Sequence, residues 1–406
     1  MPLRTEHLSD RRHLNDESPY AAQPLLNVAT SLKQLIESYD PNLLLSEAST
    51  PSRFWYSDSR VLELEQQTVF SLSWQMVGRA EQFREPGQYI TCDVAGEPML
   101  LVAGHDGVVR GFYNVCRHHA AAVMPEPQGR AEHLRCPYHG WTYNLEGALV
   151  VTPEFGGVCH FDKSRNGLAP VQTAIWQGWV FVKLVSNGLS LEEFLGEDLT
   201  RQIQKLKLEQ LSWFERRSYT VRCNWKVFID NYLDGGYHVP HIHGALNSVL
   251  DHSAYSIESG DRFCLQSSPI VSGKADAQTS ETRKGQARYY WIYPNFMINW
   301  YEGVMDTNLV LPRGNNRTEV IFDYYFTDVS ATAREKNLTS VAVSERIQDE
   351  DVTICESVQR GLSSRSYSTG RLSVRREAGE HLFHRLLHAD LKTGLPNDAA
   401  NTAKDH

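Results

Sequence analysis

The chain has 406 residues, 41% of them hydrophobic, and 40 basic side chains against 49 acidic ones give a formal net charge of −9. This apolar fraction is typical of a globular protein, and the length predicts more than one hydrophobic core. The acidic balance argues against nucleic-acid binding. No uncharged apolar run is long enough to predict a helix that spans a membrane.

The first thirty residues lack the apolar run of a secretory signal, and their acidic residues are atypical of a transit peptide. Residues 1–51 are therefore interpreted as a solvated tail with a helix. The seven cysteines are odd in number and sparse, which argues against a disulfide framework. A reducing compartment follows, and the cytoplasm is the expected location.

Residues 52–188 alternate short β-like runs, such as Gln88–Val94 and Trp179–Val185, with turns rich in glycine and proline. This pattern predicts a small all-β domain. After residue 188 the pattern changes, because Ser190 and Glu193 form a capping box that predicts an amphipathic helix to about Leu206.

Residues 189–406 mix helical and strand patterns. Helices are predicted over Asn224–Gly236 and Ala331–Leu362, and strands over Arg288–Trp300, Asn308–Leu311 and Thr318–Thr327. Strands followed by a helix, without βαβ alternation, predict an α+β domain on an antiparallel sheet.

Two cysteine–histidine pairs form the first candidate site. One residue separates Cys116 from His118, and after seventeen intervening residues Cys136 and His139 form a second short loop. Thiolates with imidazoles suit zinc or an iron–sulfur cluster. Zinc fingers usually pair cysteine with cysteine first, so the spacing favours two thiolates on one iron and two imidazoles on the other, which is the Rieske arrangement.

Three histidines within six residues form the second candidate site. His238 and His241 would share a face of an ideal helix, but Pro240 predicts that the helix ends before it. A kinked backbone could then bring His238 and His243 together. The alternative is a histidine-rich surface turn.

A third ligand is expected from the predicted late helix. Asp351 falls on its apolar stripe, where a buried carboxylate is costly unless it is paired or bound to a metal. Two histidines and one carboxylate leave coordination positions open for oxygen and water. Asp349 and Glu350 are the runner-up ligands, and the alternative for Asp351 is solvation on a frayed helix.

These motifs resemble the Rieske non-haem iron oxygenases. The resemblance rests on Asn114–His118, Cys136–Trp141, Asn224–Lys226 and Asp230–His243, although His119-Ala120 stands where the family often has Arg-Gly. It implies a Rieske domain over 52–188 and a catalytic domain of the helix-grip type over 189–406. The ligands that it implies are Cys116, His118, Cys136 and His139 for a 2Fe–2S cluster, and His238, His243 and Asp351 for mononuclear Fe(II).

The same resemblance implies how the two centres communicate. An acidic residue before the first histidine links the cluster of one subunit to the iron of the next in a head-to-tail homotrimer. Here that catalytic residue is Asp234, which lies four residues before His238 because of an extra glycine. No dinucleotide-binding fingerprint is present, so electrons are expected from a ferredoxin or a separate reductase.

The substrate prediction starts from a run of aromatic residues, Tyr289 to Tyr301, followed by the acids Glu302 and Asp306. Aromatic faces near carboxylates bind quaternary ammonium ions through cation–π attraction. The predicted substrate-binding residues are Trp291, Tyr293, Trp300 and Tyr301. The alternative is an ordinary hydrophobic core strand.

Segments 292–299, 305–312 and 355–362 resemble the choline monooxygenase branch of the family. The resemblance implies hydroxylation of choline by O2 to betaine aldehyde hydrate, in glycine betaine biosynthesis. Glycine betaine or carnitine oxidation is the alternative, and an electron-transfer or redox-sensing protein is an alternative of another class. For a plant source, the resemblance also implies the chloroplast stroma.

Overall fold

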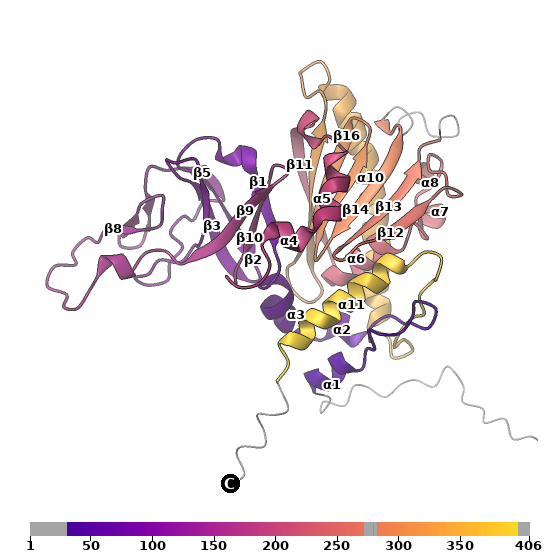
Figure 1. Ribbon diagram of the computed structural model, residues 1–406, viewed down its shortest axis with the longest axis horizontal. Coiled ribbons are helices and arrows are strands. Elements are labelled where there is room, and N and C mark those ends of the chain that lie inside the picture. Colours follow the sequence, from indigo (N-terminus) through magenta and orange to yellow (C-terminus); the bar gives the residue numbers. More distant parts are fainter. Residues whose placement is uncertain (1–30, 272–278, 280–281, 397–406) are drawn as a thin grey trace, which may run out of the picture.

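The computed structural model describes residues 31–271, 279 and 282–396 of the chain. An all-β front part leads into a back part built of one sheet and several helices (Figure 1). Residues 1–30 of the tail and helix predicted over residues 1–51 lie outside the described residues.

The front part contains a seven-stranded and a three-stranded antiparallel sheet within the described residues. Along one inner strand of the larger sheet, Leu100 and Val102 belong to one core, whereas Met99 and Leu101 belong to another, as the two-residue period of a strand requires. The strands of the larger sheet, in spatial order, are β1 (Gln75–Arg79), β10 (Trp179–Lys183), β9 (Pro170–Trp176), β4 (Val109–Tyr113), β3 (Glu97–Ala103), β2 (Gln88–Val94) and β5 (Gln128–Arg130). The smaller sheet contains β6 (Leu134–Arg135), β7 (Thr142–Tyr143) and β8 (Leu149–Val151).

The back part is built on a second seven-stranded antiparallel sheet, which agrees with the predicted α+β class. Its spatial order is β11 (Ser212–Val221), β17 (Thr318–Phe326), β16 (Val304–Pro312), β15 (Phe296–Tyr301), β14 (Gln286–Ile292), β13 (Phe263–Pro269) and β12 (Ser256–Ser259). The strand prediction over Arg288–Trp300 corresponds to two paired strands, β14 and β15. They are separated at Pro294, which has no N–H to donate to a ladder.

The described α-helices lie mostly in the back part. They are α1 (Leu32–Glu37), α2 (Phe54–Ser57), α3 (Ser59–Glu65), α4 (Leu191–Leu195), α5 (Glu197–Gln204), α6 (Trp225–Leu233), α7 (Val239–Ile242), α8 (Gly244–Asn247), α10 (Arg334–Leu362) and α11 (Ala378–Thr393). The long helix predicted to end at Leu362 is α10. The single helix predicted to about Leu206 is wrong, because Gly196 adopts a φ of 78° and divides it into α4 and α5.

Helix α6 packs against both α10 and β16, and α11 packs against α6 (Figure 1). The sheet, α6, α7 and α10 thus surround the predicted histidines and Asp351. Across the described ranges, none of the helices has the length and hydropathy needed to cross a bilayer.

Candidate metal centres and substrate cavity

The two cysteine–histidine loops have matching backbone turns. The N–H of Ala120 donates to the carbonyl of Cys116 at 3.0 Å, and the N–H of Gly140 donates to that of Cys136 at 3.1 Å. Ala120 has a φ of 59° and Gly140 a φ of 70°, so alanine adopts the left-handed conformation that glycine adopts in the second loop. This conformation costs a non-glycine residue roughly 1–2 kcal/mol. The first loop therefore keeps the same turn geometry, although His119-Ala120 stands where the family often has Arg-Gly.

The side chains of these loops fit an iron–sulfur cluster. The rings of His118 and His139 lie 4.8 Å apart, and His118 stacks on Trp141 at 4.6 Å. Both cysteines are buried, and the Cys116 sulfur lies 3.4 Å from the Tyr143 hydroxyl. The Nδ1 atom of His118 is buried and has no hydrogen-bond partner within the described chain. An imidazole nitrogen in that state beside two thiols is an available ligand, as a Rieske cluster requires.

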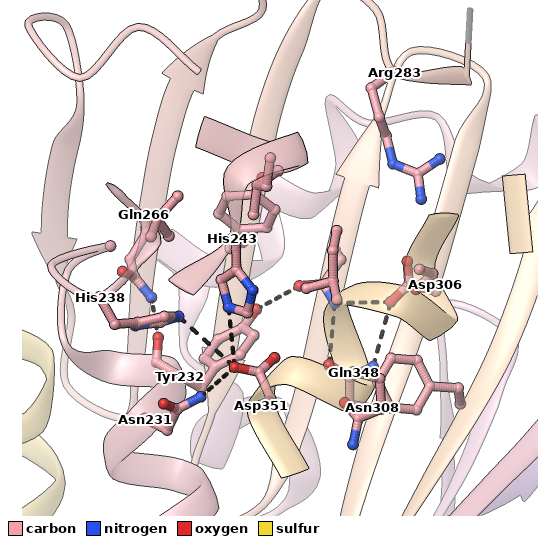
Figure 2. A pocket seen from close by; sticks show the side chains of 18 of the residues that line it. Asn231, Tyr232, His238, His243, Gln266, Arg283, Asp306, Asn308, Gln348 and Asp351 are labelled. Carbon is pink, nitrogen blue, oxygen red and sulfur yellow. Dashed lines mark hydrogen bonds and ion pairs between the residues drawn. The ribbon is translucent and has the colours of Figure 1, made fainter. Parts of the chain in front are cut away.

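The second centre brings together three groups from separate elements. His238 and His243 flank α7, and their ring centroids lie 4.8 Å apart. Asp351 reaches them from α10, with its Oδ1 atom 3.1 Å from Nε2 of His243 and 3.8 Å from Nε2 of His238 (Figure 2). Helix α6 ends at Leu233, well before Pro240, and Pro240 lies in the first turn of α7 rather than at a kink. The two histidines, five residues apart, meet because they stand at the two ends of this short helix. These three residues could hold one metal ion.

A carboxylate lies beside Nδ1 of each histidine, the ring nitrogen on the side away from Asp351. Oδ2 of Asp234 lies 2.6 Å from Nδ1 of His238 and also accepts the backbone N–H of His238 at 2.9 Å. Oε2 of Glu350 lies 2.6 Å from Nδ1 of His243. Such partners orient the ring and direct the other nitrogen toward a metal. Glu350, the runner-up ligand, therefore lies on the outer side of His243, whereas Asp349 is exposed.

Two glycines shape the turn that carries Asp234. Gly235 and Gly236 have φ values of 69° and 67°, which favour glycine. A Cβ atom on Gly235 would lie 2.1 Å from the carbonyl oxygen of Arg376. The additional glycine noted in the sequence thus lets Asp234 contact both the ring and the backbone of His238.

Helix α6 is anchored by the Asn-Trp-Lys motif at its start. The Asn224 side chain caps the helix by accepting the N–H of Lys226 at 3.1 Å. The buried carboxylate of Glu65 binds Nζ of Lys226 at 2.6 Å and accepts the Trp225 indole N–H at 2.7 Å. At the other end of the helix, Asn231 donates to Oδ1 of Asp351 at 2.7 Å. The motif therefore fixes the helix that positions Asp351 and the turn after it.

A cavity of about 110 Å³ opens beside the three candidate ligands. Its polar lining includes Arg283, Asp306 and Gln348. The Nε2 atom of Gln348 is buried without a partner in the described part of the chain, which leaves a donor for a bound molecule. The aromatic lining consists of Phe228, Tyr232, Tyr255, Tyr289, Tyr301 and Phe322.

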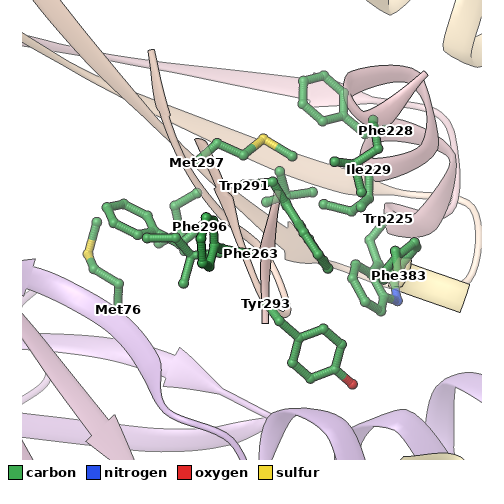
Figure 3. Packing of buried hydrophobic residues seen from close by; sticks show 14 of the residues in the cluster. Met76, Trp225, Phe228, Ile229, Phe263, Trp291, Tyr293, Phe296, Met297 and Phe383 are labelled. Carbon is green, nitrogen blue, oxygen red and sulfur yellow. The ribbon is translucent and has the colours of Figure 1, made fainter. Parts of the chain in front are cut away.

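The predicted aromatic residues are only partly found in this cavity. Tyr301 lines it, but Trp291, Tyr293 and Trp300 do not. Trp291 is fully buried and packs 5.5 Å from the Phe383 ring (Figure 3). The substrate role predicted for these three residues is therefore not supported by their positions.

The sheet register explains these positions. Tyr293 lies beyond the end of β14 and donates to Asp390 of α11 at 2.6 Å. Trp300 pairs with Arg288 on the face opposite to the cavity. Tyr289 lies two residues before Trp291 and faces the cavity, so alternation along the strand could have identified it. Tyr232 and Tyr255 come from other segments and have no comparable signal in the sequence.

Comparison with known proteins agrees with this geometry. Residues 73–162 match the Rieske [2Fe-2S] domain, and residues 208–392 match the catalytic domain of the ring hydroxylating alpha subunit. The chain therefore belongs to the Rieske oxygenases, a class of enzymes that carries a 2Fe–2S cluster and a mononuclear iron.

Particular relatives cover most of the chain. A choline monooxygenase of Arabidopsis thaliana is 39% identical over 89% of this chain and 88% of its own length. A carnitine monooxygenase oxygenase subunit of Acinetobacter pittii is 30% identical over 79% of this chain and 87% of its own. A solved quaternary ammonium Rieske monooxygenase superposes with a TM-score of 0.78 at 27% identity, covering 88% of this chain and 98% of that structure.

Proposed function

We propose that this protein is the terminal oxygenase component that hydroxylates a small quaternary ammonium compound with O2. The observation that carries the proposal is the position of His238, His243 and Asp351 at one side of a cavity with six aromatic side chains. In the proposed enzyme, the cluster supplies single electrons and the iron supplies oxygen activation. Choline is the substrate that the sequence resemblance favours, and glycine betaine or carnitine is the second candidate.

The chain's own residues would orient the substrate. Tyrosine rings surround the cavity, and a desolvated cation over an aromatic face gains about 2 kcal/mol. Asp306 adds a buried carboxylate, held by the amide of Asn299 at 2.7 Å. Gln348 lies three residues before Asp351, so its free amide could donate to a substrate oxygen near the candidate ligands. Binding of the cation would thereby be converted into orientation of the reacting carbon.

Asp234 is the proposed link between subunits, as in the predicted homotrimer. Its contact with His238 supports this role, because the carboxylate already holds the ring of a candidate ligand. The proposed electron donor is a ferredoxin or a separate reductase.

The test is turnover by the holoenzyme with a surrogate ferredoxin and reductase. Choline, glycine betaine, carnitine and a simple arene are supplied separately, and O2 uptake is compared with product formation. His238→Ala should abolish turnover while the cluster spectrum stays intact, and His241→Ala, at an exposed neighbour, is the control. Turnover by His238→Ala at the wild-type rate would overturn the assignment of the iron site. Activity with the arene alone would overturn the substrate class.

A further inference from the structure

A buried arginine lines the substrate cavity without a carboxylate partner. Arg283 is only 3% exposed, and its Nη1 atom donates to the Ser340 hydroxyl of α10 at 2.6 Å and to the backbone carbonyl of Thr282 at 3.4 Å. Its guanidinium carbon lies 4.7 Å from the centre of the Tyr301 ring. Among the residues that the structure describes, no carboxylate forms an ion pair with it. Because a guanidinium has five N–H donors in a planar fork, most of its bonding capacity is left for another group.

A buried cation in this state is unfavourable by itself. Removing a charge from water costs several kcal/mol unless an opposite charge and hydrogen bonds replace the lost hydration. The ring of Tyr301, the hydroxyl of Ser340 and the carbonyl of Thr282 supply hydrogen bonds and a cation–π contact but no opposite charge. A bound anion would supply the rest, and a carboxylate fits the planar fork in a bidentate manner.

Asp306 supplies the second charge in the cavity. It is 3% exposed, and its Oδ2 atom accepts the amides of Asn299 at 2.7 Å and Asn308 at 3.3 Å. Burial raises the pKa of its carboxyl, and the positive charge of Arg283 opposes that shift. The two groups therefore influence each other without forming an ion pair, so the cavity presents one positive and one negative group beside its tyrosines.

We propose that Arg283 binds a carboxylate of the substrate, so that the substrate is a zwitterionic quaternary ammonium compound rather than the simple cation choline. This inference rests on the proposed function and deepens it. The ammonium group is matched by the tyrosine rings and Asp306, and the carboxylate is matched by Arg283. Choline has no group for Arg283, and its positive charge would be repelled by the guanidinium.

The position of Arg283 also orients such a substrate. Figure 2 shows its guanidinium on the opposite side of the cavity from His238, His243 and Asp351. A carboxylate bound there places the other end of a short zwitterion toward the candidate metal ligands. The carbon atoms next to the nitrogen are then the ones presented for oxidation.

The experiment measures ligand binding to the holoenzyme by calorimetry. Glycine betaine and carnitine are compared with their methyl esters, which are similar in shape but lack the negative charge, and with choline. The carboxylates are expected to bind about 10- to 100-fold more tightly than the esters and choline, which is the range for a hydrogen bond between charged groups. Arg283→Gln should reduce this ratio to near one, and Arg283→Lys should restore part of it.

Arg288→Gln is the matched control, because Arg288 lies in β14, just after Arg283 in the sequence, but pairs with Trp300 on the outer face. It should keep the wild-type ratio. Equal binding of esters and carboxylates by the wild type would overturn the inference, and this comparison is decisive even if Arg283→Gln does not fold. If choline alone binds and supports O2 uptake, only the role of Arg283 fails. If no compound of the set does, the proposed function fails.

Discussion

Replacement of Glu350 tests whether the outer carboxylate of His243 stabilises the iron site. Oε2 of Glu350 lies 2.6 Å from Nδ1 of His243, a length typical of a charge-assisted hydrogen bond. The His243 side chain is 1% exposed, whereas the Glu350 side chain is 35% exposed, so water can replace the carboxylate only from the Glu350 side. Substitution of such a partner typically weakens metal binding about 10- to 100-fold, or about 1.4–2.7 kcal/mol.

Glu350→Gln keeps an acceptor oxygen but loses the charge, so a loss near 10-fold is expected. Glu350→Ala loses both, so a loss near 100-fold is expected. Iron affinity is measured by competition with a chelator, with the visible spectrum of the cluster as the internal reference. Asp349→Asn is the control, because Asp349 is the exposed preceding residue of the same helix. Iron binding by Glu350→Ala within a factor of about two of the wild type would refute the reasoning.

Three further predictions concern other groups. Asp234→Asn should lower turnover about 10- to 100-fold with the cluster retained, because it weakens the contact with His238; unchanged turnover would exclude the bridging role. Cys136→Ser should remove the cluster spectrum but leave iron at the other centre, and an intact spectrum would contradict the ligand assignment. Burial raises the pKa of the Glu380 carboxyl in the folded protein well above its ordinary value. The free energy of unfolding therefore falls as the pH rises from the pKa of Glu380 in the unfolded chain toward its pKa in the folded protein. Glu380→Gln should therefore raise the unfolding temperature relative to the wild type at about pH 8 and less at about pH 5. Glu356→Gln should instead lower the unfolding temperature, because hydrogen bonds from Arg222 lower the pKa of Glu356 and so stabilise its charged form in the folded protein. Equal effects of Glu380→Gln at both pH values would contradict the prediction.

The candidate ligands could be predicted from the sequence because their chemistry is local. Thiolates and imidazoles within three residues of each other can meet only in tight loops, and the turns at Ala120 and Gly140 show how they do so. His238 and His243 are also close in sequence, but the helix before them ends at Leu233, and the turn through Gly235 and Gly236, not Pro240, separates it from α7. Asp351 was predictable for another reason, since a carboxylate on an apolar stripe requires a partner.

The outer partners were harder to predict. Glu350 looked like a possible ligand because it is adjacent to Asp351, but adjacent residues on a helix project about 100° apart. That angle sends Asp351 to the Nε2 side of His243 and Glu350 to its Nδ1 side. Which of the two faces the centre depends on the rotation of α10 against α7.

The residue types and short spacings of the sequence were by themselves enough to predict two metal centres of different kinds. One lies in an all-β region and the other in an α+β region. Only the tertiary structure decided which side chains surround the cavity. Trp291 and Tyr289 lie two residues apart on the same face of β14. Trp291 is nevertheless covered by α11, whereas Tyr289 faces the cavity. Arg283 and Tyr255 join the cavity from segments with no local signal, because its walls form where strands and helices distant in the sequence pack together.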